Sequence, residues 1–82
     1  MGQIARTPEQ IGATIRRHRK LQSLTQGQLG EKTSLRQATI SGLEAGEGGV
    51  QLQTLMQVLA ALNLELVIQN RSASERDIAD LF

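Results

Sequence analysis

Two Thr-x-x-Gln capping boxes constrain the fold more than any other feature of the sequence. They are Thr-Pro-Glu-Gln at residues 7–10 and Thr-Gln-Gly-Gln at residues 25–28. Such a box predicts a helix start, because its side chains pair with backbone N–H groups that the first helical turn leaves without partners. One helix is therefore expected over residues 8–22, and a second, too short to be stable alone, over residues 25–32.

Apolar spacing predicts two further helices. In residues 36–44, Ile40 and Leu43 lie three apart behind small and polar positions, which is typical of a helix with a narrow buried stripe. The glycine-rich residues 46–49 then interrupt the chain. A helix over residues 52–62 follows. Its apolar residues, all expected to be buried by their spacing of three and four, are Leu52, Leu55, Met56, Leu59 and Leu62.

The composition limits how this body can be stabilised. The chain has 82 residues, one Phe, and no Trp, Tyr or Cys. It is therefore expected to form one domain with a small aliphatic core and without disulfides or thiolate metal sites. Association with a second copy is the remaining way to stabilise so small a core.

The period of apolar residues changes to two after Asn63, which predicts one β-strand over residues 64–69. A single strand cannot pair its own backbone groups, so this strand is expected to pair with its copy across a two-fold axis. Leu64, Leu66 and Ile68 are expected to point inward. The outward positions are Glu65, Val67 and Gln69. The residues assigned to dimerisation are Leu64, Leu66, Val67 and Ile68.

Charge divides the chain unequally. Residues 1–63 hold seven Lys or Arg against four Asp or Glu, a net +3, whereas residues 64–82 hold two against four, a net −2. The basic body suits a polyanion, and the acidic tail suits some other partner. The expected organisation is an arm at 1–7, a helical domain at 8–63, a strand at 64–69 and a tail at 70–82.

The tail carries a third capping box at residues 72–75 and is either a short amphipathic helix or disordered. Ile78, Leu81 and Phe82 are its candidate anchors for a protein partner, because an exposed aromatic residue at a chain end is a plausible contact. No apolar run is long enough for a bilayer, and the N-terminus lacks a signal-peptide pattern, so a cytoplasmic protein is expected.

Two short helices around a tight turn, the second with a polar outer face, predict a helix-turn-helix. The strings LTQGQLG (residues 24–30) and QATISGLEAG (residues 37–46) resemble the signature of the phage-repressor (Cro/C1, or XRE) family. The likeness covers residues 8–63 and implies a mostly α, four-to-five-helix DNA-binding domain. The chain departs from the family pattern in Gly30, where Ala is usual, and in Ser34, where Gly is usual.

One branch of this family, the HipB antitoxins, is the more similar. The resemblance rests on the Thr-Pro-x-Gln start at residues 7–10, the string RQATIS at residues 36–41, and the strand and tail. It implies a dimer joined partly by a two-stranded sheet, palindromic operators, and neutralisation of a HipA-like kinase toxin. It also implies that Glu44 pairs with Arg19 and so holds the recognition helix.

Base contacts are expected from the second helix of the motif. The amide of Gln37 can bond to both N6 and N7 of adenine, and Ala38 can touch a thymine methyl. Thr39 and Ser41 project nearby. Arg36 can pair with guanine or grip a phosphate, and the sequence leaves both open.

Phosphate contacts are expected from Thr25 and Gln26, because the first turn of a helix offers free N–H groups and the positive end of its dipole. Arg17 and Lys20, from a basic run on the first helix, are further candidates. The single His18 has no Cys or second His near it in sequence, so no metal site is expected.

The sequence leaves three functions open. The chain is an autorepressor that is also an antitoxin, a stand-alone repressor, or a helical adaptor that binds only protein. The acidic tail favours the first over the second, and the lack of apolar anchors on the outer face of residues 37–41 disfavours the third. An enzyme is not expected, and neither is a cofactor, because the sequence shows no paired-carboxylate cleft, no Cys and no phosphate-binding loop between strand and helix.

Overall fold

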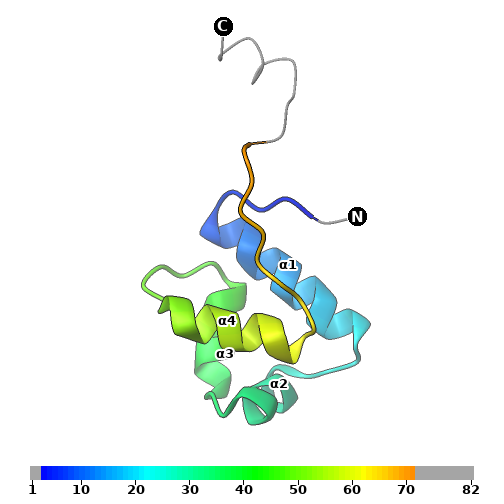
Figure 1. Cartoon of the computed structure of the whole chain (residues 1–82). Coiled ribbons are helices and arrows are strands. Elements are labelled where there is room, and N and C mark those ends of the chain that lie inside the picture. The colour runs from blue at the N-terminus through cyan, green and yellow to red at the C-terminus, as the bar shows by residue number, and fades with distance from the viewer. Residues whose placement is uncertain (1–2, 72–82) are drawn as a thin grey trace, which may run out of the picture.

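Four helices make up the body of the protein in the computed structural model, which describes residues 3–71 (Figure 1). They are α1 (Pro8–Leu21), α2 (Gln26–Thr33), α3 (Gln37–Glu44) and α4 (Leu52–Ala61). α3 packs against both α1 and α2, and α4 packs against α2. No helix within residues 3–71 combines the length and the apolar character needed to cross a membrane.

Both expected capping sequences start a helix, but the box is complete only at α2, since the Gln10 side chain at α1 accepts from the Arg6 N–H. At α2 the box is reciprocal: Thr25 Oγ1 accepts from the Gln28 N–H at 3.0 Å, and Gln28 Oε1 accepts from the Thr25 N–H at 2.8 Å. At α1, Thr7 Oγ1 accepts from the Gln10 N–H at 3.1 Å. Local hydrogen bonds thus fix both helix starts near the residues that the sequence predicts.

All four helices end in the same hydrogen-bonded turn. A left-handed residue ends each helix, at the cap of α2 and one residue beyond the cap of the other three helices. Its own N–H and that of the following residue bond back to carbonyls near the helix end, which is a Schellman motif. At the end of α3, for example, the Gly46 N–H donates to the Leu43 carbonyl at 3.1 Å and the Glu47 N–H donates to the Gly42 carbonyl at 3.0 Å. The left-handed residues are Ser23, Ser34, Gly46 and Asn63.

The core lies where the helices meet and is aliphatic. Its buried side chains, which come from every helix and from the cap of α4, are Ile15, Leu29, Ile40, Leu43, Val58, Leu59 and Leu62. Burying one such side chain contributes about 1.5–3 kcal/mol. Helices of 8 residues, such as α2 and α3, are marginal alone, so this shared burial stabilises them.

The buried face of α4 differs from the expected one. Leu52 and Met56 are 66% and 43% exposed, whereas Val58, which the spacing did not select, is fully buried. α4 has apolar residues around most of its circumference, so spacing alone did not decide which of them contact α2. The expectation that Leu52 and Met56 belong to the core of the single chain was wrong.

No strand forms among residues 3–71, and residues 64–69 have no regular secondary structure (Figure 1). Leu64 packs partly against the core, but Ile68 is 91% exposed, so it does not turn inward in the single chain. The physical reason is that a strand needs a neighbour for its ladder of hydrogen bonds, and the described chain offers none.

Candidate nucleic-acid interface

The turn between α2 and α3 holds the two helices close together. Ser34 has φ 58° and ψ 32°, so the position where the family usually has Gly is left-handed here as well. A Cβ at Gly30 would lie 2.6 Å from the Leu35 carbonyl oxygen. The two departures from the family pattern therefore differ in kind: Ser34 carries a backbone cost of about 1 kcal/mol, whereas Gly30 is required by close packing.

α3 presents one face to solvent and buries the other. Ile40 and Leu43 are buried in the core. Thr39 is half-buried, and the exposed candidates for base contacts are Arg36, Gln37, Ala38 and Ser41. The structure thus exposes four of the five predicted base-contact residues, with Arg36 at the N-cap of the helix and Thr39 partly covered.

The start of α2 adjoins the start of α3. A Cβ at Gly27 would lie 3.7 Å from Gln37 Oε1 and 3.8 Å from Thr25 Oγ1. The first turn of α2 therefore lies next to the first residue of α3. A helix N-terminus beside a glutamine amide offers donors suited to a phosphate and to a neighbouring base edge.

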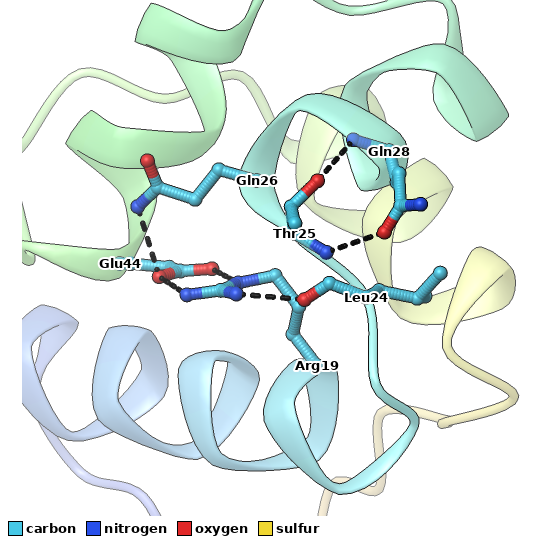
Figure 2. Close-up of polar contacts among 6 residues, drawn as sticks. All are labelled: Arg19, Leu24, Thr25, Gln26, Gln28 and Glu44. Carbon is cyan, nitrogen blue, oxygen red and sulfur yellow. Dashed lines mark hydrogen bonds and ion pairs between the residues drawn. The ribbon is translucent and has the colours of Figure 1, made fainter.

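A buried ion pair fixes the far end of α3 to α1 (Figure 2). Arg19 Nε donates to Glu44 Oε2 at 2.6 Å, and Arg19 Nη2 donates to Glu44 Oε1 at 3.0 Å. Arg19 Nη1 also donates to the Leu24 carbonyl at 2.8 Å, in the loop that leads to α2. One guanidinium thus joins three elements, in the pairing that the family resemblance implied.

Gln26 belongs to the same network, because its Nε2 donates to Glu44 Oε1 at 3.2 Å (Figure 2). Burial raises the pKa of Glu44, but the hydrogen bonds from Arg19 and Gln26, with the positive charges of Arg19 and Arg16, outweigh it and lower the pKa overall. The hydrogen bond with Glu44 raises the pKa of Arg19 against its burial. Glu44 is therefore held as a carboxylate, and the side chain predicted to meet phosphate is anchored to it.

Arg17 and Lys20 lie on a different part of the surface. Both are exposed on α1 and border a shallow hollow together with Ala13, Arg16 and Leu21, none of which comes from α2 or α3. The structure therefore groups these two cations with Arg16. It does not group them with the α3 face, and their phosphate contacts remain a prediction.

Comparison with known proteins identifies the family to which the chain belongs. The helix-turn-helix profile matches residues 15–69, which is more than half of the chain. The chain belongs to the XRE-type helix-turn-helix family of DNA-binding domains. No curated protein sequence matches it significantly.

Solved structures similar to this helix-turn-helix chain include HipB in complexes with DNA. The structure of a HipA–HipB–O2–O3 complex has a chain of 27% sequence identity and TM-score 0.79, with 87% of this chain and 100% of that chain covered. A HipB–O4 20mer complex gives the same values. A complex of a HipB variant with an O2 20mer gives 26% identity and TM-score 0.80, with 88% and 100% covered. The resemblance to the HipB branch that the sequence indicated is confirmed.

The structure describes the residues predicted to join two chains, but not those predicted to bind another protein. Leu64 is half-buried, and Leu66, Val67 and Ile68 are exposed. The tail anchors Ile78, Leu81 and Phe82, and the capping box at residues 72–75, lie outside the described residues.

Sequence reasoning missed Gly12, which lets α1 cross α3 at close range. A Cβ there would meet the Leu43 carbonyl oxygen and would lie 2.5 Å from the Glu44 carbonyl oxygen. The available signal was a glycine inside a helical pattern, which indicates close packing when it does not mark an end. Sequence reasoning also missed Glu47, because it lies in the glycine-rich segment, whose composition indicates only a break in the chain.

Proposed function

We propose that this protein is a sequence-specific transcriptional autorepressor that binds palindromic DNA as a homodimer in the cytoplasm, and that it is also the antitoxin of a HipA-like kinase toxin. It acts by binding and is not an enzyme. The observation that carries the proposal is the exposed polar face of α3, held in place by the buried Arg19–Glu44 pair, in a fold similar to HipB in complexes with DNA.

Reading of bases is assigned to α3. Gln37 lies at its first position and is exposed, so its amide can reach N6 and N7 of an adenine in the major groove. Ala38 leaves room for a thymine methyl, while Thr39 and Ser41 can bond to neighbouring bases. Arg36, at the N-cap, can reach guanine or phosphate.

Positioning on the backbone is assigned to the start of α2. The Oγ1 of Thr25 is used in the capping box, but its hydroxyl proton remains available to a phosphate oxygen. Gln26 is held by Glu44 next to the outward N–H groups of the first turn. Arg17 and Lys20 would add sequence-independent contacts, which makes binding sensitive to salt.

Dimerisation is assigned to residues 64–69. Leu66, Val67 and Ile68 are 47%, 63% and 91% exposed, an unusual density of apolar surface for so short a segment. Pairing with a second copy would bury these side chains and satisfy the backbone groups of both segments. Leu52 and Met56 expose further apolar surface that a second copy can cover.

The DNA-binding part of the proposal is tested by selecting sequences from a random duplex pool with the full chain. The selected DNA is then used in mobility-shift assays at one fixed salt concentration. Gln37→Ala is expected to cost about 1–3 kcal/mol and to relax preference at one base position in each half-site. Gln26→Ala is expected to weaken all sequences alike. Full affinity in both variants would show that the contact surface lies elsewhere.

The toxin part rests on the similarity to HipB in a HipA–HipB–DNA complex and on the acidic tail. Deletion of residues 71–82 is expected to leave binding to the selected DNA intact and to weaken capture of a HipA-like kinase encoded beside this chain at least tenfold. Equal capture in titration calorimetry would move the kinase contacts to the helical body. The absence of such a kinase gene would favour the stand-alone repressor.

A further inference from the structure

The turn that ends α3 holds a carboxylate against the recognition helix. In a Schellman motif the second residue beyond the cap commonly packs on the third residue from the helix end. Here those residues are Glu47 and Gly42, joined by the Glu47 N–H to Gly42 carbonyl bond of 3.0 Å. The Glu47 side chain also lies over Gly42, since its Oε1 is 2.6 Å and its Cδ 3.3 Å from where a Cβ of Gly42 would be. The absence of a side chain at Gly42 therefore makes room for this carboxylate.

This carboxylate lies beside residues assigned to base contacts. Gly42 follows Ala38 by four residues and Thr39 by three, so the three positions share one face of α3. All three line a hollow of about 280 Å³ between α3 and the segment leading to α4, and Glu47 is the one charged residue among the described residues that border it. Because Ala38 and Gly42 are small, the Glu47 side chain from the following loop can lie against α3 at the border of this hollow.

A carboxylate in this place can select among base edges. An ionised carboxylate only accepts hydrogen bonds, whereas phosphates, guanine O6 and N7, and thymine O4 are also acceptors and repel it. Adenine presents an amino donor, but its N7 acceptor lies next to that donor. Cytosine itself presents only its N4 amino group to the major groove, the acceptors of the pair being on guanine, and it is the base from which Glu accepts in major-groove recognition.

We propose that Glu47 is a specificity-determining residue that reads the N4 amino group of a cytosine in the major groove, with its carboxylate positioned by Gly42. This inference rests on the proposed DNA-binding function. The cytosine lies near the bases contacted by Ala38 and Thr39 and is distinct from the adenine assigned to Gln37. On DNA without a cytosine at this position, the same carboxylate faces acceptors that repel it and weakens binding. Glu47 therefore increases the discrimination between DNA sequences more than the affinity for any one of them.

The test compares base preferences of the full-length wild type and three variants on DNA selected from a random duplex pool. Each base pair of the half-site is changed in turn, and dissociation constants are measured at one salt concentration. Glu47→Gln is expected to reduce a cytosine preference at one position per half-site by at least about fivefold. It is also expected to leave the Gln37-dependent adenine preference intact and to tighten binding to unrelated DNA.

The Gly42→Ala variant tests the position of the Glu47 carboxylate separately from its charge. The added Cβ displaces the Glu47 carboxylate without removing its charge, so the same cytosine preference is expected to fall. The matched control is Glu31→Gln, which removes an exposed carboxylate on α2 outside the hollow and is expected to leave every base preference unchanged. Circular dichroism checks that each variant is folded.

Two results would overturn the assignment while leaving the proposed function in place. In the first, the selected half-site depends on Gln37 but Glu47→Gln changes no base preference. In the second, Glu47→Gln tightens binding to all sequences equally, so that the carboxylate only repels phosphate. If the wild type selects no motif at all, the proposed function fails, and this inference fails with it.

Discussion

Removal of the Glu44 carboxylate is expected to lower the free energy of unfolding by a large part of its total. In Glu44→Ala, the guanidinium of Arg19 loses its bonds of 2.6 and 3.0 Å and keeps the 2.8 Å bond to the Leu24 carbonyl. The Arg19 side chain is only 9% exposed, so its charge is left buried with one neutral acceptor. Breaking a buried pair in this way costs about 3–5 kcal/mol. A domain of this size has a total stability of roughly 4–12 kcal/mol.

Urea unfolding at pH 7, followed by circular dichroism at 222 nm, measures this loss. The control Glu31→Ala removes an exposed carboxylate and is expected to change the free energy of unfolding by less than about 0.5 kcal/mol. The double variant Arg19→Met/Glu44→Leu removes both charges and is expected to return to within about 1 kcal/mol of the wild type. A Glu44→Ala protein within about 1 kcal/mol of the wild type would refute the claim that this pair holds the helices together.

The same pair predicts an acid dependence. The pKa of Glu44 in the folded protein is lowered from its ordinary value of 4.5, so the folded state binds the proton less readily than the unfolded state. The stabilisation is therefore fully present above the ordinary pKa and is lost as the pH falls below it, through the lowered pKa. Unfolding free energies measured from pH 6 down to pH 3 are expected to fall less steeply in the double variant than in the wild type.

Three further substitutions test separate parts of the structure. Ser34→Gly is expected to raise the free energy of unfolding by about 0.5–1 kcal/mol, because glycine removes the left-handed penalty; a decrease in urea unfolding would contradict this. Gly30→Ala is expected to cost about 1–3 kcal/mol, because its Cβ would lie 2.6 Å from the Leu35 carbonyl oxygen, and an unchanged melting temperature would be inconsistent with that contact. Leu66→Pro removes a ladder donor and is expected to give a monomer that binds DNA far less well, whereas sedimentation of an intact dimer would reject strand pairing.

The features predicted correctly from sequence are those that local chemistry determines. The capping box of Thr25 and Gln28 forms its hydrogen bonds within four consecutive residues, so it needs no knowledge of the rest of the fold. Ser34 was singled out only because the family usually has Gly there, and its left-handed backbone is a finding of the structure. The Arg19–Glu44 pair spans distant residues and came only from the family resemblance.

The features that sequence analysis predicted wrongly, left unconfirmed or missed depend on contacts that periodicity does not specify. α4 is apolar on several sides, so the burial of Val58 and the exposure of Leu52 and Met56 depend on where the neighbouring helices lie. The segment 64–69 has the alternation of a strand, but its ladder needs a second strand. The Glu47 side chain lies over Gly42 because of the turn after α3, and the glycine-rich composition of residues 46–49 does not predict this contact.

The spacing between half-sites in the DNA that the full chain selects tests the central claim most directly. A dimeric helix-turn-helix places its two recognition helices about one DNA turn apart, roughly 34 Å or 10 base pairs between half-site centres. The account predicts that selection from a random duplex pool yields an inverted repeat with this spacing, and that Gln37→Ala relaxes the same position in both halves. Selection of a single unrepeated site, or of no sequence at all, would contradict it.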